Sequence, residues 1–297
     1  TQSSPKERGY RARVRMRFGP QGSLGYHQIG THTHLTVHHC PIAHDKINEV
    51  LPHLAGGPSD ATVELRTNGK DLQLDGRASS KPQRRALREW LSRLDLDRLG
   101  ILGVSMNGKR IRGQGHLPLT VGSIEHRLSP GTFYQVNLEL NERLVERLVD
   151  WVIAREPAHV LDLYAGAGNL SLPLAQQGLP VTMIESGKSA ISDATESTRR
   201  ENLQVNLQVG DAGRYQAGDH FFDLAILDPP RAGAPGVMAQ LLMTRPSSVA
   251  YLSCNPSALA RDLKPALRSG YRLEAVELFD MFTQTSHAEA LALLVRH

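Results

Sequence analysis

Short apolar blocks alternate with helix-like stretches through the second half of the chain. The blocks predict strands at residues 159–164, 180–185, 205–209, 222–228 and 248–253. The helix-like stretches lie between them, at residues 170–178, 187–202, 236–243 and 257–268. A regular succession of strand and helix is typical of α/β proteins with a parallel, doubly wound sheet.

The end of the chain breaks this rhythm. Residues 271–279 and 288–296 are two further strand candidates, with a short connection and no helix between them. We expect them to form an antiparallel pair that closes the parallel sheet. The Ala and Leu content of the second block leaves a helix open as its alternative, because short apolar runs are ambiguous.

The first half has a less regular pattern. It predicts strands at residues 10–18, 61–67, 72–77 and 101–107, and helices at residues 44–54 and 81–94. We therefore expect a smaller α+β accessory domain over residues 1–130 and the sheet domain over residues 131–297. The boundary is predicted near residues 125–131.

The two halves also differ in charge. Residues 1–130 hold 20 Lys and Arg against 11 Asp and Glu, whereas residues 131–297 hold 14 against 19. A basic half in a chain of pI about 9.2 favours a polyanionic partner such as nucleic acid. A solvated basic surface is the simpler alternative.

One strand candidate concentrates this charge. In residues 10–18 the arginines alternate with apolar residues, so the period of a strand places them all on one face. These arginines are Arg11, Arg13, Arg15 and Arg17. Like charges in a row repel one another unless an acidic partner or a polyanion lies against them, which favours contact with RNA phosphates.

The two cysteines, Cys40 and Cys254, are too few for a disulfide framework, and this favours a reducing, cytoplasmic setting. The first residues have no apolar core of a signal peptide, and no apolar run approaches the ~18 residues that a membrane helix needs. The chain begins with Thr1 rather than Met, as a fragment would.

Two motifs follow strands of the predicted sheet. In DLYAGAGNLSL (162–172) the glycines Gly166 and Gly168 form a turn between strand and helix, and Glu185 ends the next strand. Glycines let the backbone approach a ligand closely. A carboxylate at the end of the next strand typically accepts hydrogen bonds from ribose hydroxyls. The string differs from a dinucleotide fingerprint and looks like an S-adenosylmethionine loop. A glycine turn without ligand is the alternative.

LDPPRAG (227–233) places Asp228 at the carboxyl edge of the sheet, where ligands bind in such folds. Amino-methylating enzymes carry an aromatic residue after a similar Pro-Pro pair, but Arg231 follows here. A plain prolyl turn is the alternative.

A third motif, SCNP, places Cys254 between a strand and a helix that Asn255 caps and Pro256 opens. The partial positive charge of the helix N-terminus is expected to favour the thiolate. A buried structural cysteine is the alternative. Two weaker strings are GTFYQVN (131–137) and HAEAL (287–291), which contains Glu289.

The chain resembles the RNA 5-methyluridine methyltransferase family over roughly residues 8–297. The resemblance rests on five strings in this order: FYQVN, DLYAGAGNLSLPLA, DPPRAG, SCNP and HAEALALL. The resemblance implies a class I methyltransferase sheet, S-adenosylmethionine as methyl donor, and transfer or ribosomal RNA as substrate. It implies Cys254 as nucleophile and Glu289 as base. The donor contacts it implies are Gln135, Tyr164, Gly166, Gly168, Asn169, Glu185 and Asp228, with Asp211 as a looser match.

Departures from the family pattern limit what the chain is expected to bind. Many members carry an N-terminal TRAM domain, which we do not expect in residues 1–297, and some hold a 4Fe–4S cluster on four cysteines. Only Cys40 matches such a ligand position, so we expect no iron–sulfur cluster. The His-rich stretch around residues 32–44 lacks the spacing of a zinc site, and no metal is predicted.

The expected function is methylation of uridine at C5 in structured RNA by a monomeric enzyme. Two alternatives stay open. A cytosine-C5 RNA methyltransferase would use related chemistry, but it usually carries a second cysteine near the Pro-Pro motif. A catalytically silent RNA-binding or chaperone protein could keep the same scaffold.

Overall fold

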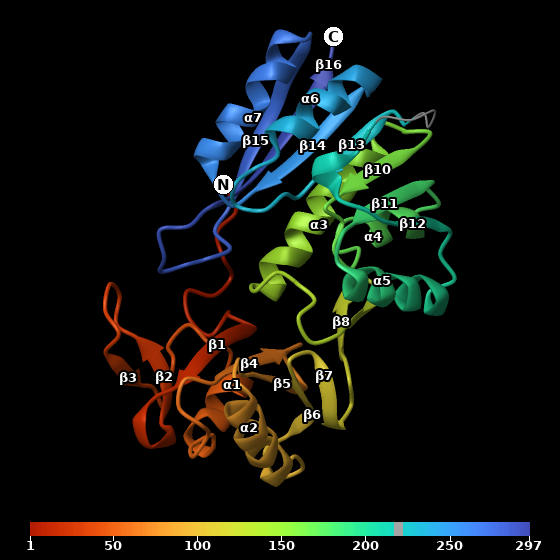
Figure 1. Cartoon of the computed structure of the whole chain (residues 1–297). Coiled ribbons are helices and arrows are strands. Elements are labelled where there is room, and N and C mark those ends of the chain that lie inside the picture. The colour runs from red at the N-terminus through yellow and green to blue at the C-terminus, as the bar shows by residue number, and fades with distance from the viewer. Residues whose placement is uncertain (217–221) are drawn as a thin grey trace. The chain divides into compact units, whose positions relative to one another are not determined.

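The computed structural model describes residues 1–216 and 222–297. The chain forms two compact units, which can be followed by colour in Figure 1. The first unit comprises residues 6–119 and 128–131, and the second comprises residues 1–5, 120–127 and 132–297. The second unit thus includes the first few residues of the chain, where Gln2 forms an isolated parallel bridge with Phe279.

The first unit is built on a seven-stranded sheet with the order β3-β2-β1-β4-β5-β6-β7. The strands are β1 (Arg13–Phe18), β2 (Leu24–His27), β3 (His34–Thr36), β4 (Thr62–Thr67), β5 (Leu72–Arg77), β6 (Ile101–Met106) and β7 (Lys109–Gly113). All neighbours are antiparallel except β5 and β6. That parallel pair is joined through α2 (Lys81–Arg93), as a crossover requires.

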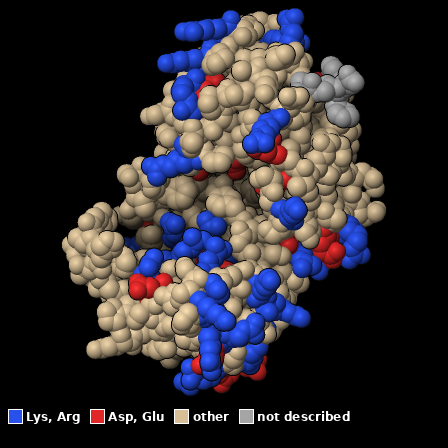
Figure 2. All heavy atoms as spheres, in the orientation of Figure 1, with Lys and Arg blue, Asp and Glu red and all other residues tan. Residues whose placement is uncertain are grey.

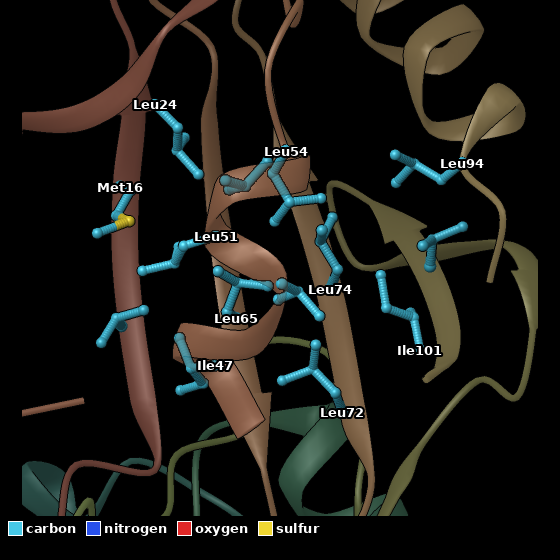
Figure 3. Close-up of a cluster of buried hydrophobic side chains, with 14 of the residues drawn as sticks. Met16, Leu24, Ile47, Leu51, Leu54, Leu65, Leu72, Leu74, Leu94 and Ile101 are labelled. Atoms are coloured by element: carbon cyan, nitrogen blue, oxygen red, sulfur yellow. The ribbon is translucent and has the colours of Figure 1, made fainter. Parts of the chain in front are cut away.

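The core of the first unit follows from the alternation along β1. Val14, Met16 and Phe18 are buried, and they pack with residues of the neighbouring strands and of α1 (Asp45–Val50), among them Ile47 and Leu65 (Figure 3). The predicted helix over residues 44–54 is split. Only α1 is α-helical, and Leu51–His53 form a 3₁₀ turn.

The second unit carries a seven-stranded sheet with the order β12-β11-β10-β13-β14-β16-β15 (Figure 1). Its strands are β10 (Val160–Leu163), β11 (Val181–Glu185), β12 (Val205–Val209), β13 (Leu224–Leu227), β14 (Ser248–Ser253), β15 (Tyr271–Phe279) and β16 (Glu289–Arg296). The first five strands in the order are mutually parallel, and β16 is antiparallel to both of its neighbours. The predicted class I methyltransferase sheet is confirmed, and the helix alternative for the last block is wrong.

Within residues 1–216 and 222–297, this unit has five α-helices: α3 (Leu138–Ile153), α4 (Ser171–Gln176), α5 (Lys188–Arg200), α6 (Pro235–Thr244) and α7 (Pro256–Arg268). A short hairpin of β8 (Leu117–Val121) and β9 (Ile124–Leu128), which the pattern did not predict, forms a separate two-stranded sheet. In the described part of the chain no helix has the length and apolarity needed to cross a membrane.

Candidate active site

Three polar residues line up where the central parallel strands end. Leu163 of β10 is in register with Ile184 of β11 on one side and with Leu227 of β13 on the other. The residues that follow these three along their strands are Tyr164, Glu185 and Asp228. The direction in which successive strands are added to the sheet reverses between β10 and β13. Ligands of such sheets bind in the crevice at this switch point.

The glycine loop begins in a strained backbone conformation. Tyr164, Gly166 and Gly168 all have positive φ, at 66°, 57° and 89°. A Cβ at Gly168 would stand 2.6 Å from a side-chain atom of Leu172, so both the backbone and the packing require glycine there. The loop is therefore built to turn tightly at the start of α4.

Glu185 holds this loop against the end of β11. Its carboxylate accepts the Gly166 amide at 3.1 Å and the Gly187 amide at 2.6 Å. The side chain of Asn169 is fixed in turn by α3, because its amide exchanges two hydrogen bonds with the amide of Asn141, at 2.8 and 2.9 Å. The loop residues that sequence reasoning grouped thus lie together.

The other predicted donor contacts lie at different depths. Gln135 is buried, two residues before Asn137, which caps α3 by accepting the Leu140 amide. Asp211 is more exposed and accepts the Gly213 amide at 2.9 Å at the start of a 3₁₀ turn. Its charge helps to raise the pKa of Tyr164, after burial, so it lies on the side of the glycine loop.

Sequence reasoning missed Asp162, the acid that opens the glycine string. This residue is 1% exposed, its Oδ2 accepts the Ser171 hydroxyl, and its Oδ1 has no partner in the described residues. Burial raises its pKa to about 8, with smaller contributions from the negative charges of Asp228 and Glu185, while the Ser171 hydrogen bond opposes the rise. Its place before two glycines was a signal available in the sequence.

Cys254 and Glu289 come together from opposite strand ends. Ser253, the last residue of β14, is paired with Ala290 of β16. Cys254 directly follows Ser253 and Glu289 directly precedes Ala290, so both residues lie at this end of the ladder, and the charge of Glu289 helps to raise the pKa of the Cys254 thiol. Cys254 is partly exposed, whereas Glu289 is only 3% exposed.

The electrostatics of this pair correct one expectation. Asn255 and Pro256 do begin α7, and Asn255 accepts the amides of Ser257 and Ala258. The pKa of the Cys254 thiol is nevertheless raised, first by burial and then by the negative charges of Glu289 and Asp228. The predicted preference for the thiolate is wrong, because burial and, second to it, the carboxylates of Glu289 and Asp228 raise the pKa of the thiol.

The two carboxyl groups are perturbed in the same direction. Burial raises the pKa of Glu289 to about 8, helped by the charge of Asp228, and burial raises the pKa of Asp228 to about 7. The cysteine and both acids therefore share one poorly hydrated place at the carboxyl edge of the sheet. Strongly perturbed groups gathered in this way are typical of catalytic sites.

A second missed feature is the attachment of the Pro-Pro loop to α7. The side-chain amide of Asn255 donates a hydrogen bond to the Arg231 carbonyl at 3.0 Å. The Arg261 guanidinium donates one to the Ala232 carbonyl at 2.6 Å. The buried carboxylate of Asp262 accepts the Ala234 amide at 2.6 Å and the Tyr251 hydroxyl at 2.7 Å. The loop that carries Asp228 and the helix that follows Cys254 are thereby fastened together.

The predicted arginine face belongs to the first unit. Arg11, Arg13, Arg15 and Arg17 do alternate with buried residues. Arg15 forms an ion pair of 2.7 Å with Glu64 on β4, and Arg17 lies 3.4 Å from Asp60. The row is therefore partly neutralised within the chain.

The remaining thiol and the His-rich stretch of residues 32–44 lie in the same unit. Cys40 is buried, and its backbone is held by Asn48. Among the residues that the structure describes, no three His, Cys, Asp or Glu side chains form a group that could hold a metal ion.

The sheet order, the glycine loop and the acid that ends the second strand define a class I S-adenosylmethionine-dependent methyltransferase. Family models agree: a methyltransferase domain matches residues 160–229, and the tRNA (uracil-5-)-methyltransferase family matches residues 213–297. The chain is 31% identical to the 23S rRNA (uracil(1939)-C(5))-methyltransferase RlmD of an Enterobacter species, over 96% of this chain and 70% of that protein. The Klebsiella pneumoniae RlmD is also 31% identical, over 97% and 70%.

The chain belongs to the RNA uracil-C5 methyltransferase family. The fold of the Pyrococcus abyssi tRNA (uracil-54, C5)-methyltransferase, solved with S-adenosyl-L-homocysteine, is similar over 99% of this chain and 78% of that one. The TM-score is 0.79 at 22% identity, so this likeness speaks for the fold.

Proposed function

We propose that this enzyme transfers a methyl group from S-adenosylmethionine to C5 of a uridine in structured RNA, with Cys254 as nucleophile and Glu289 as base. The observation that supports the proposal is the register of β14 and β16, whose last pair, Ser253 and Ala290, directly adjoins Cys254 and Glu289 in the sequence. They lie at the edge of the sheet that also holds the glycine loop.

The residues around the glycine loop fit the methyl donor. Its ammonium group and ribose hydroxyls are hydrogen-bond donors, and next to the loop lie the carboxylate of Glu185 and the carboxyl group of Asp162, whose Oδ1 has no partner among the described residues. The proposed site also includes the glycines Gly166 and Gly168 and the side chains of Gln135, Tyr164, Asn169, Asp211 and Asp228. When bound there, the donor supplies a methyl group on a positively charged sulfur.

Cys254 makes C5 reactive. Uracil C5 is a weak nucleophile, so the thiolate first adds to C6 and the ring becomes an enolate with electron density on C5. A new C5–CH₃ bond can then form while the donor's sulfur keeps the electron pair of the bond it loses. The reacting base has to leave its stack to reach the partly buried Cys254.

Glu289 completes the turnover. After methylation C5 holds both a proton and the methyl group, and Cys254 remains bound to C6. The ionised carboxylate of Glu289 takes the C5 proton, the electron pair restores the C5–C6 double bond, and the thiolate leaves. A carboxyl group whose pKa is raised to about 8 is a stronger base than an exposed glutamate.

We propose 23S ribosomal RNA as the substrate, because the relatives that match nearly the whole chain are named for uracil 1939 of that RNA. Transfer RNA is the second candidate, because the similar fold over 99% of the chain is that of a tRNA (uracil-54, C5)-methyltransferase. We expect a monomeric, cytoplasmic enzyme in which residues 1–130 bind RNA through Arg11, Arg13, Arg15 and Arg17.

The test is methyl transfer from labelled donor to transcribed RNA fragments, followed by nucleoside analysis. The proposal expects 5-methyluridine, formed faster on a 23S fragment containing the equivalent of uracil 1939 than on transfer RNA. Formation of 5-methylcytidine would instead show that the enzyme is a cytosine-C5 RNA methyltransferase. Absence of transfer to any RNA would favour the silent scaffold.

A further inference from the structure

The surplus positive charge of the first unit is concentrated outside the arginine face of β1. Residues 79–113 hold nine Lys and Arg against three Asp and Glu, a net +6 of the +9 that residues 1–130 carry. The basic residues of this segment are Lys81, Arg84, Arg85, Arg88, Arg93, Arg98, Lys109, Arg110 and Arg112. All nine are exposed.

Helix α2 presents four of these residues together. Lys81, Arg84, Arg85 and Arg88 have the spacing i, i+3, i+4 and i+7, so they follow one side of the helix. A different side of the helix, with Leu87, Trp90 and Leu91, is buried in the core. The single acid of the helix, Glu89, pairs with Arg85 at 3.1 Å, which leaves the charges of the other three without a carboxylate partner in the described residues.

Strand β7 continues the same surface. It is the edge strand of the sheet, paired only with β6, and it exposes Lys109, Arg110 and Arg112. Arg112 donates to the Ser92 and Leu94 carbonyls at the end of α2, at 2.7 and 3.0 Å, and so fastens the strand to the helix. Figure 2 shows Lys and Arg side chains gathered over the first unit.

The arginine face of β1 differs in one respect. Two of its four charges, on Arg15 and Arg17, already face the carboxylates of Glu64 and Asp60. Charges on the surface of α2 and β7 have fewer such partners, so a polyanion gains more by binding them. The cations of β7 could instead serve only to keep this edge strand from pairing with strands of other molecules, and this is the alternative to RNA binding.

We propose that α2 and β7 form a phosphate-binding surface that holds the backbone of the substrate RNA. The inference rests on the proposed function, because it takes the occupant to be the RNA that the enzyme methylates. Contacts of this kind set affinity and its dependence on salt without reading sequence.

The experiment compares two double variants that each lose two basic residues four positions apart on an exposed helix face. Arg84→Ala/Arg88→Ala changes α2, and Lys264→Ala/Arg268→Ala changes α7 as the matched control. Binding of a 23S rRNA fragment is measured over a range of salt concentrations. We expect the α2 variant to lower the slope of log affinity against log salt by roughly 1.4–1.8, at 0.7–0.9 per lost phosphate contact, and the control to leave it nearly unchanged.

Further measurements separate the outcomes. Arg84→Lys/Arg88→Lys should retain the salt slope, since the charges remain, and this shows that loss of fold is not the cause. Donor affinity of all variants should match that of the unmutated enzyme. An unchanged slope in the Ala variant, or an equal drop in the control, overturns the inference. Failure of the proposed function has a different signature, since the unmutated enzyme would then not form 5-methyluridine.

Discussion

The raised pKa of Glu289 predicts that activity increases from neutral to alkaline pH. The proposed base acts only when it is ionised, and the pKa of Glu289 is about 8 because the side chain is buried and faces Asp228. The ionised fraction then grows from about one tenth at pH 7 to about nine tenths at pH 9. The pKa of the Cys254 thiol is also raised, so ionisation of the thiol increases in the same direction.

Proton removal by Glu289 follows methyl transfer, so it affects kcat, and we therefore expect kcat to rise about tenfold or more between pH 7 and pH 9. The assay is the steady-state rate of turnover at saturating RNA and methyl donor, with ionic strength held constant because RNA binding depends on salt. Asp228→Asn removes one negative charge near Glu289, which should lower the pKa of Glu289. The pH at which the rate reaches half of its maximum should then be lower in this variant, even if the maximal rate itself changes. A rate that is constant or falls from pH 7 to pH 9 would refute the assignment of Glu289 as a base with raised pKa.

Three further predictions concern the supports of the site. Gly168→Ala should destabilise the fold by about 1–3 kcal/mol and weaken donor binding, because its φ is 89° and a Cβ would meet Leu172; thermal melts and calorimetry measure both. Asp262→Asn should weaken methyl-donor binding and lower kcat several-fold, because the loop that carries the proposed donor contact Asp228 loses one anchor; unchanged donor affinity in a folded variant would show that this anchor does not position the loop. Arg13→Ala/Arg15→Ala should weaken RNA binding and flatten its salt dependence while donor affinity stays constant, and an unchanged slope would mean that this face is only solvated.

The architecture of the second unit could be predicted because its strands are continuous apolar blocks between helices. Buried parallel strands are apolar on both faces, and this leaves a clear signal in the sequence. Strands β2, β3 and β7 of the first unit were missed for the opposite reason. They are short or exposed, and β7 reads KRIRG, with one apolar residue.

The candidate residues were predictable, but their electrostatics were not. Motif order indicated Cys254 and Glu289, and the last register pair of β14 and β16, Ser253 and Ala290, directly adjoins both residues. The pKa of the thiol is raised first by burial and then by the carboxylates of Glu289 and Asp228, whereas the local sequence shows only the helix N-terminus. Asp262, which holds the Pro-Pro loop, lies inside a helix pattern where nothing marks it as different from a surface acid.

The central claim is that Cys254 opens the reaction and Glu289 closes it, and one gel tests both. RNA containing 5-fluorouridine is incubated with donor and with the unmutated enzyme, Cys254→Ala or Glu289→Gln, and denatured complexes are separated. Fluorine cannot leave C5 as a cation, so the unmutated enzyme should form a methylated RNA–protein adduct that survives denaturation. Glu289→Gln should accumulate the same adduct on ordinary uridine, because the C5 proton stays. Cys254→Ala should give no adduct on either RNA. An adduct with Cys254→Ala would place the nucleophile elsewhere, and normal turnover by Glu289→Gln would show that another group is the base.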